Sequence, residues 1–197
     1  MINNDKKLNK ISRNRRFADL AVLGDTVFHI NDLANLWNIR DRNTLRKTLS
    51  RYVAAGLIHR IHRGFYSLKN LRDIDAYSLG LKAIHRFAYI SCESVLSDNG
   101  IINQSPTEIT LVSDISRRYK IGDLNFRSRR LTYNFLYNDV GILNRNDIRI
   151  ATVERAVADM LYFNPRAYFD ASTSKLINWK AVKNIATKIG YNIKIPS

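Results

Sequence analysis

The sequence contains little cysteine and no long apolar run. Cys92 is the only cysteine among 197 residues, so an intrachain disulfide or a zinc site built on several cysteines is excluded. We expect Cys92 to be a core residue, because burial is the commonest environment of a free cysteine. No apolar segment approaches the roughly 20 residues that span a bilayer. The polar N-terminal segment lacks the apolar stretch of a secretion signal, which predicts a cytoplasmic protein.

Acidic residues are also scarce. The chain has 32 basic and 17 acidic residues, a net charge of +15. Such a surplus favours a polyanionic partner, and without a membrane-spanning segment nucleic acid is preferred to a membrane. The hydrophobic fraction of 45% is ordinary for a globular protein, and the length suits one large or two small domains. We expect two.

The segment 40–67 has the pattern of an amphipathic helix, a glycine stop and a hairpin. At 100° per residue, one helical face carries Leu45, Leu49, Tyr52 and Val53, and it predicts a core seam. Asp41 or Asn43 is suited to cap the start of this helix, and Gly56 suits its end. The following residues, LIHRI and FYSL, are prone to form strands around Gly64.

The preceding residues complete a winged helix-turn-helix within residues 11–69. A first helix is expected from Ile11 to Leu23, followed by a short extended segment over 27–30. A second helix is expected to begin at a cap formed by Asn31 or Asp32 and to run through Trp37. In this fold the helix of the 40–67 segment recognises DNA and the hairpin is the wing. We therefore assign residues 1–69, with a net charge of +9, to a DNA-binding domain.

The side chains opposite the apolar seam are the expected DNA contacts. Base-edge contacts are expected from Asn43, Arg46, Lys47 and Ser50, and phosphate or minor-groove contacts from Arg60 and Arg63 of the wing. Arg42 and Arg51 flank the base-contacting face and belong to the same predicted surface. The alternative is that these charges form an ordinary solvated face.

Residues 70–197 are predicted to form a mixed α+β domain after a polar linker, Lys69 to Asp73. The expected helices cover 75–86, a short segment capped by Ser91, 153–163 capped by Thr152, and 175–189. The expected strands cover 87–90, 108–112, 133–137 and 147–150. The buried stripe of the last helix is expected to consist of Leu176, Trp179, Val182, Ala186 and Ile189.

This second domain contains a basic cluster between residues 117 and 130. Its predicted DNA contacts are Arg117, Arg118, Arg127, Arg129 and Arg130. The alternative is again solvated surface. The ten tyrosines of the chain also raise the possibility of base stacking on single-stranded nucleic acid, although most fall in stripes that suit cores and edges.

Signals for catalysis are weak. Asp73-Ile74-Asp75 has the Asp-x-Asp spacing of metal-binding nucleotidyltransferases, but no phosphate-binding glycine-serine element precedes it, and helix capping explains it better. The four histidines lack zinc-ligand spacing, and no nuclease motif, phosphate loop or Ser-His-Asp candidate is present. We therefore expect no enzymatic activity, no cofactor and no metal.

Three segments carry a resemblance to a known family. They are residues 56–66 (GLIHRIHRGFY), residues 89–96 (YISCESVL) and residues 150–159 (IATVERAVAD), and together they resemble the AbiEi antitoxins of bacterial abortive-infection systems. The resemblance extends from about Phe17 to Phe163. Cys92 and Val95 differ from the family's Ser-His-x-Ser-Ala pattern. Glu154 and Arg155 match a structural signature, for which an ion pair at the start of a helix is the simplest role.

The resemblance implies a type IV antitoxin that also represses transcription. It implies a winged-helix domain that binds repeats in the promoter of its own operon, and a C-terminal domain that counters a nucleotidyltransferase toxin without a stable complex. With no heptad pattern, a monomer that binds paired sites is expected. The rival hypotheses are a plain regulator whose C-terminal half senses a ligand or partner, and a nuclease or nucleotidyltransferase targeted by its winged helix.

Overall fold

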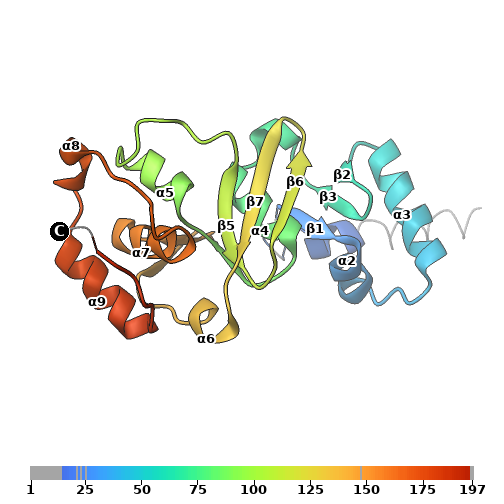
Figure 1. Cartoon of the computed structure of the whole chain (residues 1–197). Helices are drawn as coiled ribbons and strands as arrows, with labels where there is room; N and C mark the ends of the chain where they lie inside the picture. The colour runs from blue at the N-terminus through green and yellow to red at the C-terminus, as the bar shows by residue number, and fades with distance from the viewer. Residues whose placement is uncertain (1–14, 21, 23, 25, 147, 196–197) are drawn as a thin grey trace, which may run out of the picture. The chain divides into compact units, whose positions relative to one another are not determined.

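The chain divides into two units, residues 1–74 and residues 75–197, in the computed structural model (Figure 1). The structure describes residues 15–20, 22, 24, 26–146 and 148–195. The division follows Ile74, whereas the sequence interpretation placed it after Lys69. The single turn η1 (Leu71–Asp73) and the buried side chain of Ile74 extend the first unit beyond the polar linker.

Unit 1, residues 1–74, combines helices with one small antiparallel sheet. Residues 15–20 and 22 are helical, while residues 11–14, 21 and 23 of the expected first helix lie outside the described residues. The strands follow the order β1-β3-β2 in the sheet. The remaining elements of unit 1 are β1 (Val27–His29), α2 (Ile30–Leu36), α3 (Arg42–Ala54), β2 (His59–His62) and β3 (Phe65–Ser67).

The apolar seam of α3 packs into the core of unit 1. Leu45, Leu49 and Tyr52 are buried there, as predicted, whereas Val53 is only half-buried. The helix begins where the Asp41 carboxylate accepts a hydrogen bond from the backbone N–H of Thr44 at 2.6 Å. After it, Gly56 has a φ of +67°, the left-handed conformation that the sequence led us to expect.

The start of α2 differs from the expectation. Its N-cap is His29, and neither Asn31 nor Asp32 occupies that position. Asp32 lies in the first helical turn, and its carboxylate accepts a hydrogen bond from the backbone N–H of His29 at 3.0 Å. The helix therefore starts directly after β1, because the reciprocal capping arrangement satisfies donors at its first turn.

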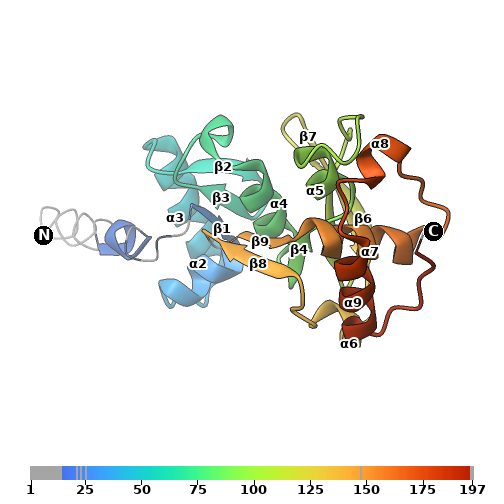
Figure 2. The same ribbon diagram turned by 90° about the vertical axis from the view of Figure 1, so that its left-hand side faces the viewer.

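Unit 2, residues 75–197, is built on a six-stranded mixed sheet with the order β6-β7-β5-β4-β9-β8. Figure 2 shows the antiparallel pair β8 and β9 at one edge. The chain as a whole is therefore of mixed α+β class. The strands are β4 (Ala88–Ile90), β5 (Ile109–Ser113), β6 (Arg117–Ile121), β7 (Leu124–Arg130), β8 (Ile142–Arg145) and β9 (Ile148–Ala151).

Helices cover both faces of this sheet (Figure 1). Gly80 of α4 packs so closely on one face that an added Cβ would lie 2.5 Å from the ring of Phe126. On the other face, the hydroxyl of Tyr89 in β4 donates to Asp159 of α7 at 3.0 Å. The helices are α4 (Ala76–Ile84), α5 (Glu93–Asp98), α6 (Tyr133–Leu136), α7 (Val153–Phe163), α8 (Ala171–Ser174) and α9 (Trp179–Ile189). None of those in the described ranges is long and apolar enough to cross a bilayer.

Two elements of unit 2 were predicted wrongly. Residues 133–136 form α6 and no strand, because a short apolar run fits either periodicity and here Tyr133 and Tyr137 pack one helical turn apart, with ring centroids at 4.6 Å. The last helix begins at Trp179, after Asn178 accepts a hydrogen bond from the backbone N–H of Ala181. Leu176 consequently lies outside the buried stripe and is 66% exposed. Asp147 of the predicted strand 147–150 lies outside the described residues.

The interior of unit 2 contains a buried ion pair between Arg155 and Asp159 of α7. Both side chains are fully buried, and Nε of Arg155 donates to Asp159 at 3.0 Å. The remaining guanidinium donors reach the carbonyl oxygens of Phe135, Asn138 and Val140 and the hydroxyl oxygen of Tyr89. Arg155 does not form the expected pair with Glu154, because it points inward and its counter-charge lies one turn further along α7.

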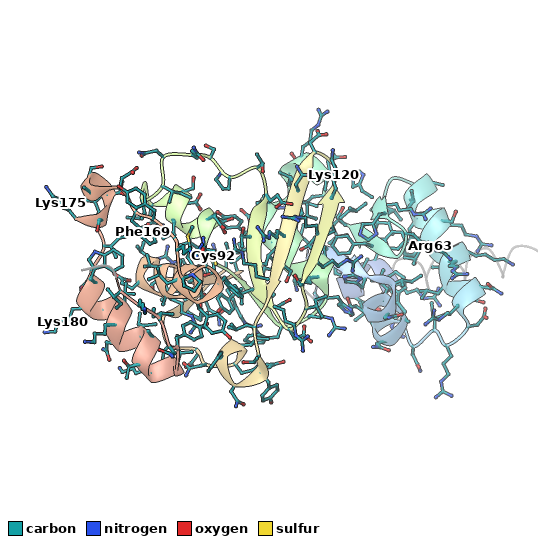
Figure 3. All side chains as sticks on the ribbon, in the orientation of Figure 1. Arg63, Cys92, Lys120, Phe169, Lys175 and Lys180 are labelled. Carbon is teal, nitrogen blue, oxygen red and sulfur yellow. The ribbon has the colours of Figure 1, made fainter. Side chains whose placement is uncertain are left out.

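Three hydroxyl groups complete this network around Asp159. Ser91, Tyr89 and Tyr191 donate to its carboxylate at 2.7, 3.0 and 2.7 Å. Burial, followed by the charge of Asp159, raises the pKa of Tyr89 well above its usual value. Ser91 therefore serves this network and does not cap α5, whose N-cap is Cys92. Cys92 is itself buried, as predicted, and Figure 3 shows it inside unit 2.

Removing the negative charge of the pair should destabilise unit 2 strongly. We expect Asp159→Asn to lower the free energy of unfolding by about 3–5 kcal/mol, because Arg155 then stays buried without a counter-charge. Glu108→Gln is the matched control, since Glu108 pairs with an exposed arginine, Arg118, and should cost at most about 1 kcal/mol. Urea unfolding followed by circular dichroism measures both. Equal losses would contradict the role given to the buried pair.

Candidate nucleic-acid interface

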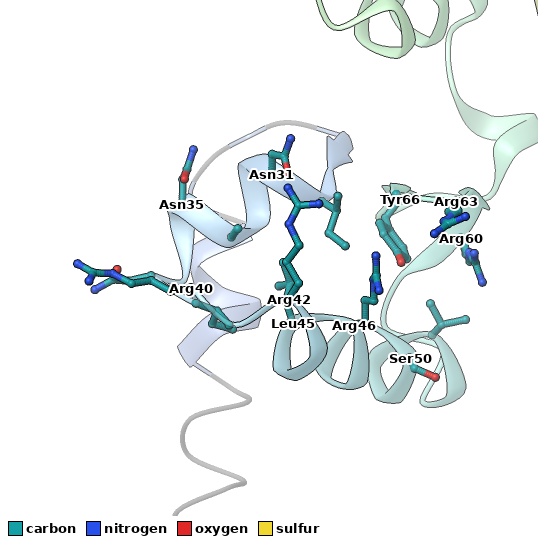
Figure 4. Close-up of a pocket in the computed structure, with 16 residues that line it drawn as sticks. Asn31, Asn35, Arg40, Arg42, Leu45, Arg46, Ser50, Arg60, Arg63 and Tyr66 are labelled. Carbon is teal, nitrogen blue, oxygen red and sulfur yellow. The ribbon is translucent and has the colours of Figure 1, made fainter.

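A groove lies between α2, α3 and the β2–β3 hairpin of unit 1. Its volume is about 1210 Å³. Figure 4 shows Arg42 and Arg46 extending from α3, with Arg60 and Arg63 on the hairpin beyond them. Arg40, from the turn between the helices, also lines the groove. Five arginines from three chain segments therefore surround one concave surface.

The orientation of α3 explains which side chains reach this groove. The Leu45–Leu49–Tyr52 seam faces the core. Arg42, Arg46 and Ser50 lie on the helical face next to this seam, and their side chains therefore line the groove. Asn43 and Lys47 lie nearly opposite the seam and are exposed. They form the outermost edge of the helix.

The hairpin is held against the start of α2. The backbone N–H of Ile30 donates to the carbonyl of Gly64 at 2.8 Å, and Gly64 has a φ of +80° at the tip. The ring of Phe65 lies 4.7 Å from that of His29 and 5.1 Å from that of His62. These contacts fix the positions of Arg60 and Arg63 relative to α2.

The positive charge of the groove is not neutralised within the described part of unit 1. The arginine ion pairs between described residues all lie in unit 2, and none of them involves the five arginines of the groove. The nearest carboxylate in sequence, Asp41, is engaged in capping α3, and the hydrogen bonds from Thr44 lower its pKa. The groove thus offers several uncompensated guanidinium groups, the groups that bind phosphate oxygens in bidentate fashion.

The predicted contact residues of unit 1 are only partly gathered in the groove. Arg42, Arg46, Ser50, Arg60 and Arg63 line it. Asn43 and Lys47 occupy the adjoining outer edge of α3, and Arg51 is exposed on the far flank of the helix.

Sequence reasoning did not identify the contribution of α2 and the following turn. Asn31 and Asn35 lie one helical turn apart on α2 and line the groove, together with Asn38 and Arg40. The signal was available in the spacing of the two asparagines, since residues four apart share a helical face. Their polar side chains widen the groove surface beyond α3 and the hairpin.

Two arginines of the basic cluster of unit 2 form ion pairs within the protein, which the sequence did not predict. Arg129 pairs with Glu93, is stacked over the ring of Phe163, and has a side chain only 12% exposed. Arg129 therefore contributes to the packing of unit 2, and its guanidinium is less accessible than the sequence suggested. Arg118 pairs with Glu108 at 2.9 Å but keeps most of its side chain exposed.

The remaining members of this cluster have no ion-pair partner in the described ranges. Arg127 lies directly opposite Arg118 on the neighbouring strand, and the carboxylate of Glu108 beside Arg118 offsets part of the repulsion between the two like charges. Arg117, Arg118 and Arg127 line a small depression of about 310 Å³, and Arg130 is exposed at the end of β7.

The Asp73-Ile74-Asp75 segment, the weak candidate for a metal site, has another role. Asp75 is the N-cap of α4, and its carboxylate accepts a hydrogen bond from the backbone N–H of Ser78 at 2.8 Å. Within the described ranges, no three His, Cys, Asp or Glu side chains are grouped so that they could hold a metal ion. Helix capping thus accounts for Asp75, as the sequence interpretation preferred.

Comparison with known proteins finds a solved structure with a similar fold but no match in sequence. No protein-family model matches the chain, and no curated protein matches it in sequence. Among solved structures, the chain is similar to the RV2827C protein from Mycobacterium tuberculosis, with a TM-score of 0.53 and 10% sequence identity. The match covers 90% of this chain and 71% of that one. At this identity the likeness concerns the fold alone.

Proposed function

We propose that the chain is a sequence-specific DNA-binding protein whose unit 1 acts as a winged helix-turn-helix. The observation that carries this proposal is the exposed polar edge of α3 beside a groove lined by five arginines, none of which has an ion-pair partner among the described residues. In the proposed complex, α3 enters the major groove and the β2–β3 hairpin is the wing.

The dimensions of α3 suit this role. Its 13 residues give a length of about 20 Å, and a helix fits a major groove about 12 Å wide. Asn43 and Lys47 on the outer edge would then meet base edges. Arg60 and Arg63 lie to the side, where the phosphate backbone would pass.

We further propose that the DNA is the promoter of the protein's own operon, and that the protein is an autorepressor and antitoxin without enzymatic activity. This part rests on the resemblance of three segments to the AbiEi antitoxins. It includes a nucleotidyltransferase toxin as functional partner, opposed without a stable complex, and a monomer that binds paired sites. A toxin gene beside this one would favour this role over that of a plain regulator. Metal-dependent turnover of nucleic acid or nucleotide would favour the nuclease or nucleotidyltransferase alternative.

Sequence choice should depend on the outer edge of α3. With a duplex selected from a random library for tight binding, Asn43→Ala should cost about 1–3 kcal/mol, and it should cost little on unselected DNA. Arg63→Ala is the control, because loss of a phosphate contact should weaken both duplexes alike. Mobility-shift titrations measure the four affinities. Equal weakening of both duplexes by Asn43→Ala would remove Asn43 from base recognition.

Arg117 and Arg127 of unit 2, which have no ion-pair partner among the described residues, should make additional contacts with DNA phosphates. If Arg117 and Arg127 each neutralise one phosphate, replacing both with alanine should flatten the slope of log K against log salt by roughly 2. Arg129→Ala should leave the slope unchanged, because its guanidinium is already paired with Glu93. The measurement is a salt titration of duplex affinity at a temperature where all variants are folded. An unchanged slope in the double variant would show that these arginines are solvated surface.

A further inference from the structure

Four planar side chains of unit 2 lie next to one another in a row at one end of its sheet. The guanidinium of Arg149 lies 4.4 Å from the ring centroid of Phe87, and that ring lies 4.5 Å from the ring of Tyr137. Tyr137 in turn lies 4.6 Å from Tyr133. We name these four residues the aromatic ladder.

The tyrosine end of the aromatic ladder is exposed to solvent. Tyr133 is 73% exposed and Tyr137 is 48% exposed, so both rings leave apolar surface in contact with solvent. Neither hydroxyl group has a hydrogen-bond partner among the described residues. A ring that contacts a neighbour on one side and solvent on the other is suited to stack one more planar group.

The surroundings of the ladder carry positive charge. Arg130 pairs in register with Ser113, and Ser113 pairs with Ala88, so Arg86, Phe87 and Arg130 reach the same end of the sheet. Arg149 belongs to the ladder itself. Asp114 is also at this end, and it is already paired with Arg86 at 2.6 Å. Asp139 follows Tyr137 by two residues.

We propose that the aromatic ladder binds single-stranded nucleic acid, with a base stacked on Tyr133 and the strand's phosphates near Arg130. Every base has a face that can stack on an aromatic ring, and arginines beside such rings attract the backbone. The positive surroundings favour this occupant over an apolar protein partner. An intact duplex keeps its bases stacked internally, so the ladder would act on DNA or RNA that is unpaired. The site is thus distinct from α3 and does not depend on the proposed duplex binding.

Fluorescence anisotropy of the full chain with labelled oligo-dT and oligo-rU of about 12 nucleotides tests this site. Tyr133→Ala should weaken binding by about fivefold to a hundredfold, the range measured for the loss of one stacked base. Tyr133→Trp should retain binding, because it keeps a stacking face. Tyr168→Ala is the matched control, since Tyr168 is 79% exposed but lies outside the ladder. Comparing the two oligonucleotides shows whether DNA or RNA is the better ligand.

Other outcomes would overturn the proposal. These are no binding of either strand by the unaltered chain, wild-type affinity in Tyr133→Ala, or an equal loss in Tyr168→Ala. Photocrosslinking of an oligonucleotide containing 5-iodouridine gives a second measurement, with the adduct expected on Tyr133 or Tyr137. An adduct found only elsewhere would also overturn it. Asn43→Ala should leave single-strand affinity unchanged and Tyr133→Ala should leave duplex affinity unchanged, so either function can fail without the other.

Discussion

The packing of one face of α3 against the core of unit 1 determines where the charged side chains that α3 contributes to the groove lie. Leu45, Leu49 and Tyr52 are almost completely buried, and each such side chain contributes on the order of 2 kcal/mol by leaving water. A helix turns by 100° per residue, so fixing this seam also fixes the directions of Arg46 and Asn43. The cap at Asp41 sets where the helix begins. The direction of the polar surface that we propose to face DNA is thus a consequence of burial on the opposite side.

Unit 2 depends on a different constraint, the satisfaction of a buried charge pair. Two of the segments on which the proposed AbiEi assignment rests meet here, since Tyr89 and Ser91 contribute hydroxyl groups to the Asp159 carboxylate that pairs with Arg155. Gly141 belongs to the same arrangement, because its φ is +77° and an added Cβ would lie 2.8 Å from Cβ of Arg155. These residues hold the sheet and α7 together. The resemblance in these two segments therefore concerns the framework of unit 2.

Local patterns predicted the elements whose signals are local. The seam of α3, the left-handed Gly56 and the turn at Gly64 follow from spacing and from glycine's conformational freedom, and the structure contains all three. The sequence did not reveal that Arg155 is buried, because a charged residue on a helix is normally exposed. The aspartate four residues later in an otherwise apolar segment was the available clue. The pairing of Arg129 could not have been predicted, since its partner Glu93 is 36 residues away and only the fold brings them together.

The central claim is that the exposed polar side of α3, which carries Asn43, Lys47 and, at the border of the groove, Ser50, lies against the bases of a bound duplex. Ser50→Cys carrying an iron chelate tests it directly, because the native Cys92 is buried, which raises the pKa of its thiol and leaves it unlabelled. On a selected duplex, the Ser50→Cys conjugate should cut both strands at a few neighbouring base pairs inside the protected site. A conjugate at Ala18, exposed on the first helix and outside the groove, should not cut there. Cleavage of the site from Ala18→Cys and none from Ser50→Cys would contradict the account.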